Sequence, residues 1–238
     1  MEKSRTPLDK WLLALYLLTH PAISGVNAVV LADVLKVTYK TAWSILHKIR
    51  HVISSMDDQS PLAGSVEAMV ASYCRPLIGS VLPHPKEHPV VVGLELDPGR
   101  EGRKVKMKIP NPEWLSISRR NKLNYYGEKW FEESHVASLK VRFIHQPLRF
   151  KKEAGALRSL VNRAQAWAAE IFRGIGGKYL QSYLDEFCFR FNYVLQERKP
   201  GDAFACLAAA CLKFRPTRLR MTCRKNRYEY PIQMAAAW

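Results

Sequence analysis

Apolar residues follow a helical period in three successive segments of the first 55 residues. The first segment opens with Pro7, which suits the first helical position, and Thr6 precedes it as the expected N-cap. The second covers residues 27–35, and the third is VTYKTAWSILHKIR, residues 37–50. Three helices that pack against one another are therefore predicted. The expected buried residues are Leu8, Leu12, Ala14, Leu15, Tyr16 and Leu18 in the first, Val30, Leu31 and Val34 in the second, and Ala42, Ile45, Leu46, Ile49 and Ile53 in the third.

The second and third segments are separated only by a short break at Lys36 and Val37, a spacing typical of a helix-turn-helix. The turn has no glycine, so Lys36 must adopt or avoid a left-handed conformation. Thr38 is the expected N-cap of the third helix, whose first turns enter the DNA major groove in this motif. A three-helix interaction module whose charged face meets only water is the alternative. The predicted DNA-binding residues of this helix are Thr38, Tyr39, Lys40, Thr41, Trp43, Ser44, His47, Lys48 and Arg50.

Residues 57–64 concentrate acidic, polar, Pro and Gly residues and are predicted to be a linker. They separate a helix-turn-helix domain, residues 1–56, from a larger domain of residues 65–212. The larger domain begins with β-prone runs and ends with amphipathic helices, which gives an α+β or α/β chain. The predicted strands cover 65–73, 90–96, 104–109 and 136–145, with a hairpin between the second and third, and the predicted helices cover 156–172 and 178–195.

The charge balance strengthens the nucleic-acid interpretation of the helices. The chain has 37 Lys and Arg against 21 Asp and Glu, which gives a formal net charge of +16. So large an excess destabilises a compact state unless something neutralises it, so a polyanion is the expected partner. A generic basic surface kept for solubility is the alternative.

Residues 213–238 form a predicted basic tail, with seven basic residues and no acidic one between Lys213 and Arg227. Such a segment contacts phosphates without specifying a base sequence. In the absence of nucleic acid it is expected to be solvated and disordered. The predicted contacts in the tail are Arg215, Arg218, Arg220, Arg224, Lys225 and Arg227.

Other classes of protein are disfavoured by the sequence. The chain has no run of about 18 apolar residues to span a bilayer, and its first residues lack the apolar run of a signal peptide. A cytoplasmic, nucleoid-associated protein without a membrane partner is therefore expected. The five cysteines form no C-x-x-C pair, so neither a disulfide framework nor a zinc ribbon is predicted. His84 and His88, in a Pro-rich loop, are interpreted as solvated rather than metal-bound.

Three stretches, RTPLDKWLLALYLL, VTYKTAWSILHKIR and above all KYLQSYLDEFCFRFN, resemble the insertion-sequence transposases of the DDE class that are related to eukaryotic Merlin elements. The resemblance covers both ends of the chain and is weaker in the middle. It implies a helix-turn-helix that recognises terminal inverted repeats, followed by a ribonuclease-H-like domain whose acidic residues hold two divalent ions. Members of the family usually carry a zinc ribbon ahead of the first helix.

The acidic positions that this resemblance implies are altered here. The family motif V-E-V-D-E-T-Y matches residues 66–71, where Met69 occupies the Asp position. The second ligand is expected on a later strand, yet no Asp occurs between Asp97 and Asp185. The family allows Asn at the third position, where this chain has Asn162, either a surviving ligand or an ordinary polar helix residue.

Glu67, Glu95 or Glu128 could replace the missing Asp side chains, because Glu also binds Mg²⁺. The extra methylene moves the carboxylate farther than an octahedral site tolerates easily, so a disabled active site is predicted. Glu67, Glu95 and Asn162 are then only vestigial candidates, and the chain is predicted to have no catalytic residue, no metal site and no cofactor. Mg²⁺ is expected as a cofactor only if the chain is an active transposase.

The sequence as a whole predicts a transposase-derived DNA-binding protein without strand-transfer activity, acting as a sequence-specific binder or regulator. An active DDE transposase that cuts and joins DNA at insertion-sequence ends is one alternative, and a protein-interaction or assembly factor is the other. The predicted partners are double-stranded DNA and either a second copy of the chain or a related transposase.

Overall fold

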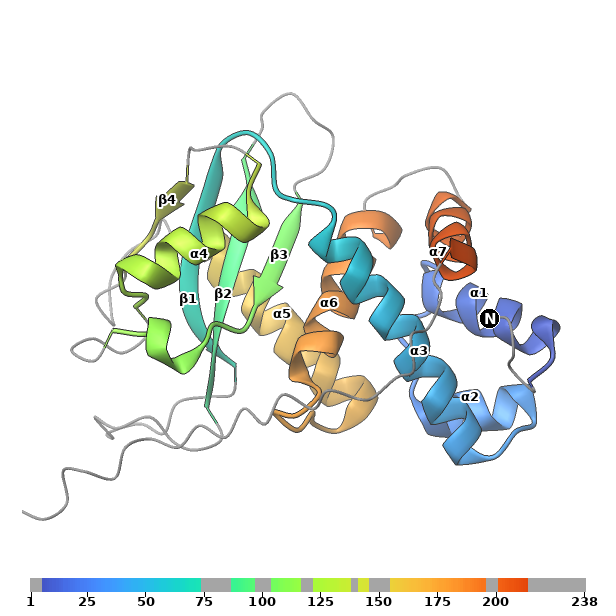
Figure 1. Ribbon diagram of the computed structural model, residues 1–238. Coiled ribbons are helices and arrows are strands. Elements are labelled where there is room, and N and C mark those ends of the chain that lie inside the picture. Colours follow the sequence, from blue (N-terminus) through green and yellow to red (C-terminus); the bar gives the residue numbers. More distant parts are fainter. Residues whose placement is uncertain are drawn as a thin grey trace, which may run out of the picture.

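The computed structural model describes residues 6–73, 87–96, 104–116, 122–137, 141–145, 155–195 and 201–213. Within these ranges, a mixed four-stranded sheet lies beside a group of helices that come from both ends of the chain (Figure 1). The prediction of a chain that combines α-helices and β-strands is confirmed.

The N-terminal part folds into the three helices that the hydrophobic pattern predicts. They are α1 (Leu8–Thr19), α2 (Ala28–Leu35) and α3 (Tyr39–Asp58). The first begins one residue later than expected, because Pro7 is the N-cap in place of Thr6 and has an extended ψ of 150°. Its cap carries no side-chain hydrogen bond.

Polar caps define the turn between α2 and α3. The side chain of Asn27 caps α2 by accepting hydrogen bonds from two backbone N–H groups of the first turn. The Thr38 hydroxyl caps α3 as predicted, accepting from the Thr41 N–H at 3.3 Å. Between the two caps, Lys36 adopts the left-handed conformation, with φ 51° and ψ 54°. A lysine thus takes the position that glycine usually occupies at the end of a helix.

The sheet has the strand order β3-β2-β1-β4. Its strands are β1 (Val66–Tyr73), β2 (His88–Glu95), β3 (Val105–Lys108) and β4 (Val141–Phe143). The predicted hairpin is confirmed, since β2 pairs antiparallel with β3, and β1 pairs antiparallel with β2 and parallel with β4. The last strand is shorter than the predicted 136–145, and Val136 instead forms an isolated bridge with Leu62.

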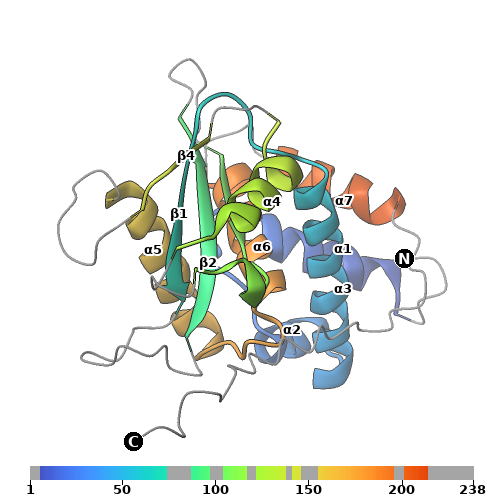
Figure 2. The ribbon, with the colours of Figure 1, turned by 60° about the vertical axis from the view of Figure 1, so that its left-hand side comes forward.

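Helices cover both faces of this sheet (Figures 1 and 2). One face carries α4 (Tyr125–His135), whose Phe131 packs on β1 and β2. A Cβ on Gly93 would lie 2.8 Å from the Phe131 ring, so a residue without a side chain lets α4 approach. The other face carries α5 (Gly155–Phe172) and α6 (Leu180–Phe189). Both strand faces are therefore buried, which explains the nearly continuous apolar run of β2.

The free edge of β3 is covered by α6 and the π-helical segment Arg190–Val194 that continues it. The Asn192 side chain accepts from the N–H of Val105 and donates to its carbonyl, both at 2.9 Å. The Gln181 side chain accepts from the Ile109 N–H and donates to the Met107 carbonyl. Two side-chain amides thus supply the hydrogen bonds that a neighbouring strand would make.

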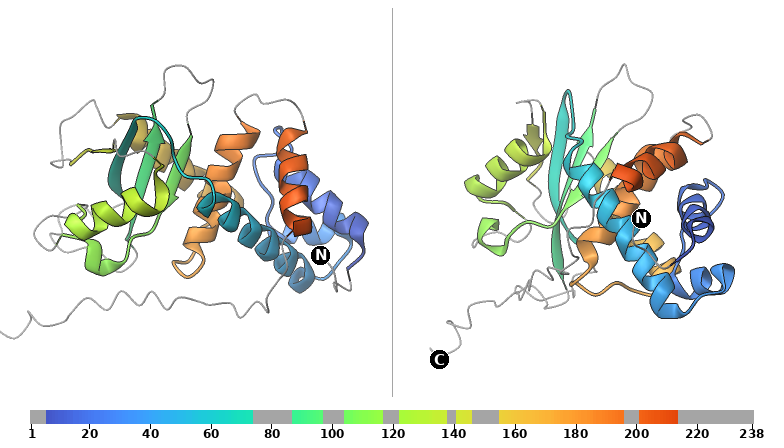
Figure 3. Two further views of the ribbon diagram at one scale, coloured as in Figure 1. Left: turned by 45° about the horizontal axis from the view of Figure 1, so that its top comes forward. Right: turned by 45° about the vertical axis from the view of Figure 1, so that its right-hand side comes forward.

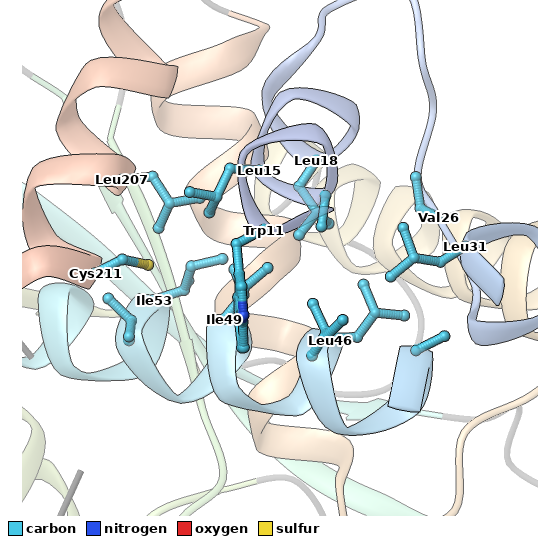
Figure 4. Close-up of a cluster of buried hydrophobic side chains, with 14 of the residues drawn as sticks. Trp11, Leu15, Leu18, Val26, Leu31, Leu46, Ile49, Ile53, Leu207 and Cys211 are labelled. Atoms are coloured by element: carbon cyan, nitrogen blue, oxygen red, sulfur yellow. The ribbon is translucent and has the colours of Figure 1, made fainter. Parts of the chain in front are cut away.

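The last helix, α7 (Asp202–Lys213), returns to the N-terminal helices. Its Leu207 and Cys211 pack with Leu15 and Ile53 in one core cluster (Figure 4). Figure 3 shows α6 between the sheet and these helices. The N-terminal core is therefore completed by residues from the C-terminal part of the chain.

Residues 57 and 58 belong to α3 instead of starting a linker. Asp57 Oδ2 lies 2.8 Å from Lys108 Nζ and 3.1 Å from Lys106 Nζ. Lys108 also pairs with Asp58 at 2.9 Å and with Asp185 of α6 at 3.1 Å. This junction cluster of Asp57, Asp58, Lys106, Lys108 and Asp185 joins α3 to the sheet and to α6.

The buried faces of α1 and α2 differ from the predicted ones. In α1 the buried side chains include Trp11, Ala14, Leu15 and Leu18, and in α2 they include Leu31 and Leu35. Leucine and valine are abundant on every side of these two helices, so periodicity alone could not select the inner face. The apolar residues left exposed on the two helices are Leu8, Leu12, Leu13, Tyr16, Val29, Val30 and Val34.

Candidate nucleic-acid interface

A polar stripe follows the side of α3 that faces away from its core, and its members are Lys40, Ser44, His47, Lys48 and His51. They recur at i, i+4, i+7, i+8 and i+11, so they share one side of the helix. Lys40 and His51 are exposed, and the other three are half-buried. No Asp or Glu occurs between Thr38 and Met56. The stripe is about 16 Å long at 1.5 Å per residue.

The first turn of α3 is the most accessible part of the predicted contact set. Thr38, Tyr39 and Lys40 are exposed, and the Tyr39 side chain is 58% accessible. Thr41 is half-buried, with its hydroxyl 2.9 Å from that of Thr38. The structure thus brings these predicted residues together at the N-terminal end of the helix.

Trp43 and His47 are held by an aromatic cluster rather than projecting freely. Their ring centroids lie 4.0 Å apart, and the His47 ring lies 4.9 Å from Tyr179 and 6.2 Å from Tyr183. Burial, and secondarily the charge of Arg50, lower the pKa of His47 to about 4. Its imidazole is therefore neutral at pH 7 and supplies no counter-charge to a phosphate, and its Nε2 is buried.

Lys48 is half-buried, and its ammonium lies 5.6 Å from the centroid of the Trp11 ring. Its aliphatic stem therefore covers α1 while the charged end stays near the surface.

Arg50 is not part of any surface, contrary to its assignment as a DNA-binding residue. Only 1% of it is exposed, and its Nε donates to Glu186 Oε2 at 2.6 Å. The guanidinium also stacks 4.0 Å from the Tyr183 centroid and 5.3 Å from that of Phe172. Its partners lie 122 or more positions away in sequence, so the local pattern gave no sign of them. Arg50 leaves the candidate set.

His51 is the member of the stripe that the sequence reasoning missed. It is exposed and lies four residues after His47 and seven after Ser44. The helical period that placed Ser44 outside could have identified it. The predicted phosphate contacts of the tail, from Arg215 to Arg227, lie outside the described residues.

The vestigial catalytic positions do not converge. Met69 is 4% exposed and packs in the apolar cluster between β1, β2 and α5, where an unpaired carboxylate would be strongly disfavoured. Glu67 pairs in register with Leu94, whereas Glu95 pairs with Val66. Since side chains alternate along a strand, Glu67 and Glu95 point to opposite faces of the sheet and cannot share a metal ion.

The remaining candidates also stand apart. Glu67 lies 3.5 Å from Arg142 of β4, and Glu128 of α4 lies 3.4 Å from His145 Nε2. Asn162 is exposed on α5. Across the described ranges, no group of three or more His, Cys, Asp or Glu side chains is placed to hold a metal ion.

Among the helices that the structure describes, none combines the length and the apolar character needed to cross a bilayer. Comparisons with known protein families, with curated proteins and with solved structures find no match to this chain.

Proposed function

We propose that the chain is a transposase-derived, sequence-specific DNA-binding protein that neither cuts nor joins DNA. The observation that carries the proposal is the carboxylate-free polar stripe of α3, set at the N-capped end of a three-helix arrangement in a chain of net charge +16. Helices of this kind read bases through their first turns while neighbouring basic residues neutralise phosphates.

The larger part of the chain supports the transposase origin at the level of its architecture. A mixed sheet with helices on both faces is compatible with the ribonuclease-H-like domain that the resemblance implies. The apolar packing of Met69 and the opposite orientations of Glu67 and Glu95 support the absence of two-metal chemistry, which needs carboxylates that face one another across a short gap.

The experiment that tests this function is selection of bound sequences from a random DNA pool with the purified chain. We expect a recurring sequence to emerge and its binding to be independent of divalent metal. The selected duplex is then incubated with the chain and Mg²⁺ or Mn²⁺, and the DNA ends are analysed. The absence of any selected sequence contradicts the proposal, and metal-dependent cleavage favours the active transposase instead.

A matched variant separates true cleavage from a contaminating nuclease. Glu67→Ala removes the carboxylate two positions before Met69 on β1, and Glu133→Ala removes an exposed carboxylate on the opposite side of the sheet. Cleavage that disappears in the first variant and persists in the second would assign it to this chain.

A second candidate function, protein assembly, is favoured by the exposed apolar residues of α1 and α2. Val29 is 66% exposed and Leu8 is 57% exposed, and five further apolar side chains on these helices are open to solvent. Exposed apolar sets of this size often mark protein contacts. Sedimentation of the chain alone and of a Val29→Lys, Leu12→Lys variant would reveal a dimer that depends on these helices, and a monomer in both would exclude a dimer formed there.

A further inference from the structure

The connection between α5 and α6, residues 173–179 of sequence RGIGGKY, ends at Tyr179 beside the polar stripe of α3. The Tyr179 ring centroid is 4.9 Å from that of His47 and 6.0 Å from that of Trp43. Tyr183, one turn into α6, stacks on Arg50 from the same side. These contacts fix the connection against the half of α3 that enters the groove in the proposed function.

The connection carries two basic side chains, one at its start and one next to Tyr179. Arg173 and Lys178 are both exposed, and the Lys178 ammonium lies 5.1 Å from the Tyr179 ring centroid. Arg173 and Gly174 adopt φ values of 54° and 113°, which turn the chain sharply as it leaves α5.

Gly177 anchors the connection to the start of β2. A Cβ at this position would come within 2.5 Å of the His88 ring, so the backbone passes directly over that imidazole. The basic residues on either side of Gly177 are thus presented from a segment that is tied both to the sheet and to α3.

The connection and α3 as far as Met56 contain basic residues and no acidic one. The connection lies in a stretch without Asp or Glu, between Glu170 and Asp185, and α3 has none between Thr38 and Met56. Outside the core, their cations are Lys40 and Lys48 on the helix and Arg173 and Lys178 on the connection. A helix seated in a major groove is flanked by the phosphates of the groove walls, so basic groups beside it meet the backbone.

We propose that Arg173 and Lys178 form a phosphate-contacting arm that grips the duplex DNA backbone beside the groove entered by α3. This inference rests on the proposed DNA-binding function and deepens it. The arm contributes affinity and positions α3, whereas base choice stays with the helix.

The test compares Arg173→Ala, Lys178→Ala and their combination with the parent chain, on the duplex selected by the parent and on an unrelated duplex, over a range of salt concentrations. Each single variant should weaken binding to both duplexes by the same factor. The slope of log affinity against log salt should fall by about 0.9 for each phosphate that the variant no longer neutralises. Lys178→Arg should retain parental binding, and the sequence selected from a random pool should not change.

Lys129→Ala is the charge-matched control, because Lys129 is exposed on α4, on the far face of the sheet. It should leave the salt slope at the parental value, and circular dichroism should show each variant folded. If both Ala variants keep the parental salt slope, the proposal of a phosphate-contacting arm is wrong, although the chain still binds DNA. A parent that binds no duplex overturns the arm together with the proposed function.

Discussion

At the residue scale, α3 shows how similar basic side chains acquire different roles. Lys40 and Arg50 lie ten positions apart on the same helix, yet the first is exposed and the second is 1% exposed. Arg50 can be buried because Glu186 neutralises it and the rings of Tyr183 and Phe172 face its plane. Lys40 has no such enclosure, so it remains available to a ligand.

Base recognition is expected to depend on Lys40 and Ser44. Replacing either by Ala should reduce discrimination between the selected sequence and a mismatched one by about 1 to 3 kcal/mol, if that side chain contacts a base edge. Stability should change little, because both positions lie on the outer side of the helix. Competition binding with single-base variants measures the effect. An unchanged sequence preference in both variants would remove α3 as the reading element.

Arg50 is expected to matter for stability and not for direct DNA contact. Arg50→Ala leaves the Glu186 carboxylate buried and unpaired, which should lower the free energy of unfolding by about 3 to 5 kcal/mol. The double variant Arg50→Met, Glu186→Leu should recover much of this stability, since no unpaired charge remains. Chemical denaturation measures both. A stable Arg50→Ala variant with weakened DNA binding would return Arg50 to the interface.

At the element scale, α6 closes the open edge of the sheet. An edge strand exposes unpaired backbone groups that invite aggregation, and β3 presents them to α6. Gln181, in the first turn of α6, and Asn192, in the π-helical segment after it, satisfy these groups through their side-chain amides. The edge of the short strand β3 is therefore paired with helical side chains instead of with a further strand.

Asn192→Leu tests this arrangement. The variant leaves the Val105 N–H and carbonyl without these partners in a buried site, so the free energy of unfolding should fall by about 1 to 3 kcal/mol. Asn162→Leu is the matched control, because Asn162 is exposed on α5 and its replacement should cost no more than about 0.5 kcal/mol. Equal denaturation midpoints for the two variants would contradict the capping role of Asn192.

At the scale of the whole molecule, buried polar contacts fasten the N-terminal helices to the rest of the chain. The junction cluster joins α3, β3 and α6, and the guanidinium of Arg190 donates to the carbonyls of Leu18 and Ile23 in the N-terminal part. The Asn27 side chain donates to the Ile171 carbonyl at 3.0 Å. These contacts fix α3 and the N-terminal helices to the sheet and to α6.

The junction cluster also makes stability depend on pH through His135 of α4. Burial, and then the charges of Lys108 and Lys106, lower the pKa of His135 to about 4, against a smaller opposing effect of Asp57 and Asp58. In the described structure neither of its ring nitrogens has a hydrogen-bond partner. Between pH 6.5 and 4 the unfolded chain binds a proton at this site that the folded chain does not.

The free energy of unfolding should therefore fall as pH decreases from 6.5 toward 4. The lowered pKa of His47 changes the stability in the same direction. Burial raises the pKa of Asp185, an effect that Lys108 partly offsets, and this raised pKa acts in the opposite direction by favouring the folded chain at low pH. The His135→Phe variant, which keeps an aromatic ring, isolates the site: its stability should decline less steeply than that of the parent over this interval. Parallel pH profiles from denaturant titrations would contradict the assignment.

The types of the main elements could be predicted from local patterns in the amino-acid sequence. Periodicity located α1, α2, α3 and α5, and the turn-bearing apolar runs located β1 and the hairpin, because these signals depend on local backbone geometry and side-chain alternation. The same period placed Lys40 and Ser44 on the outer side of α3.

Which faces meet was settled by the packing of the folded chain. That packing buried Arg50 against Glu186, exposed Val30 and Leu12 where burial was expected, and put Glu67 and Glu95 on opposite faces of the sheet. It also brought Tyr179, at the end of the connection between α5 and α6, beside α3. These outcomes depend on partners that are distant in sequence. The residues next to an apolar or charged side chain in the sequence do not indicate which distant residue will pack against it.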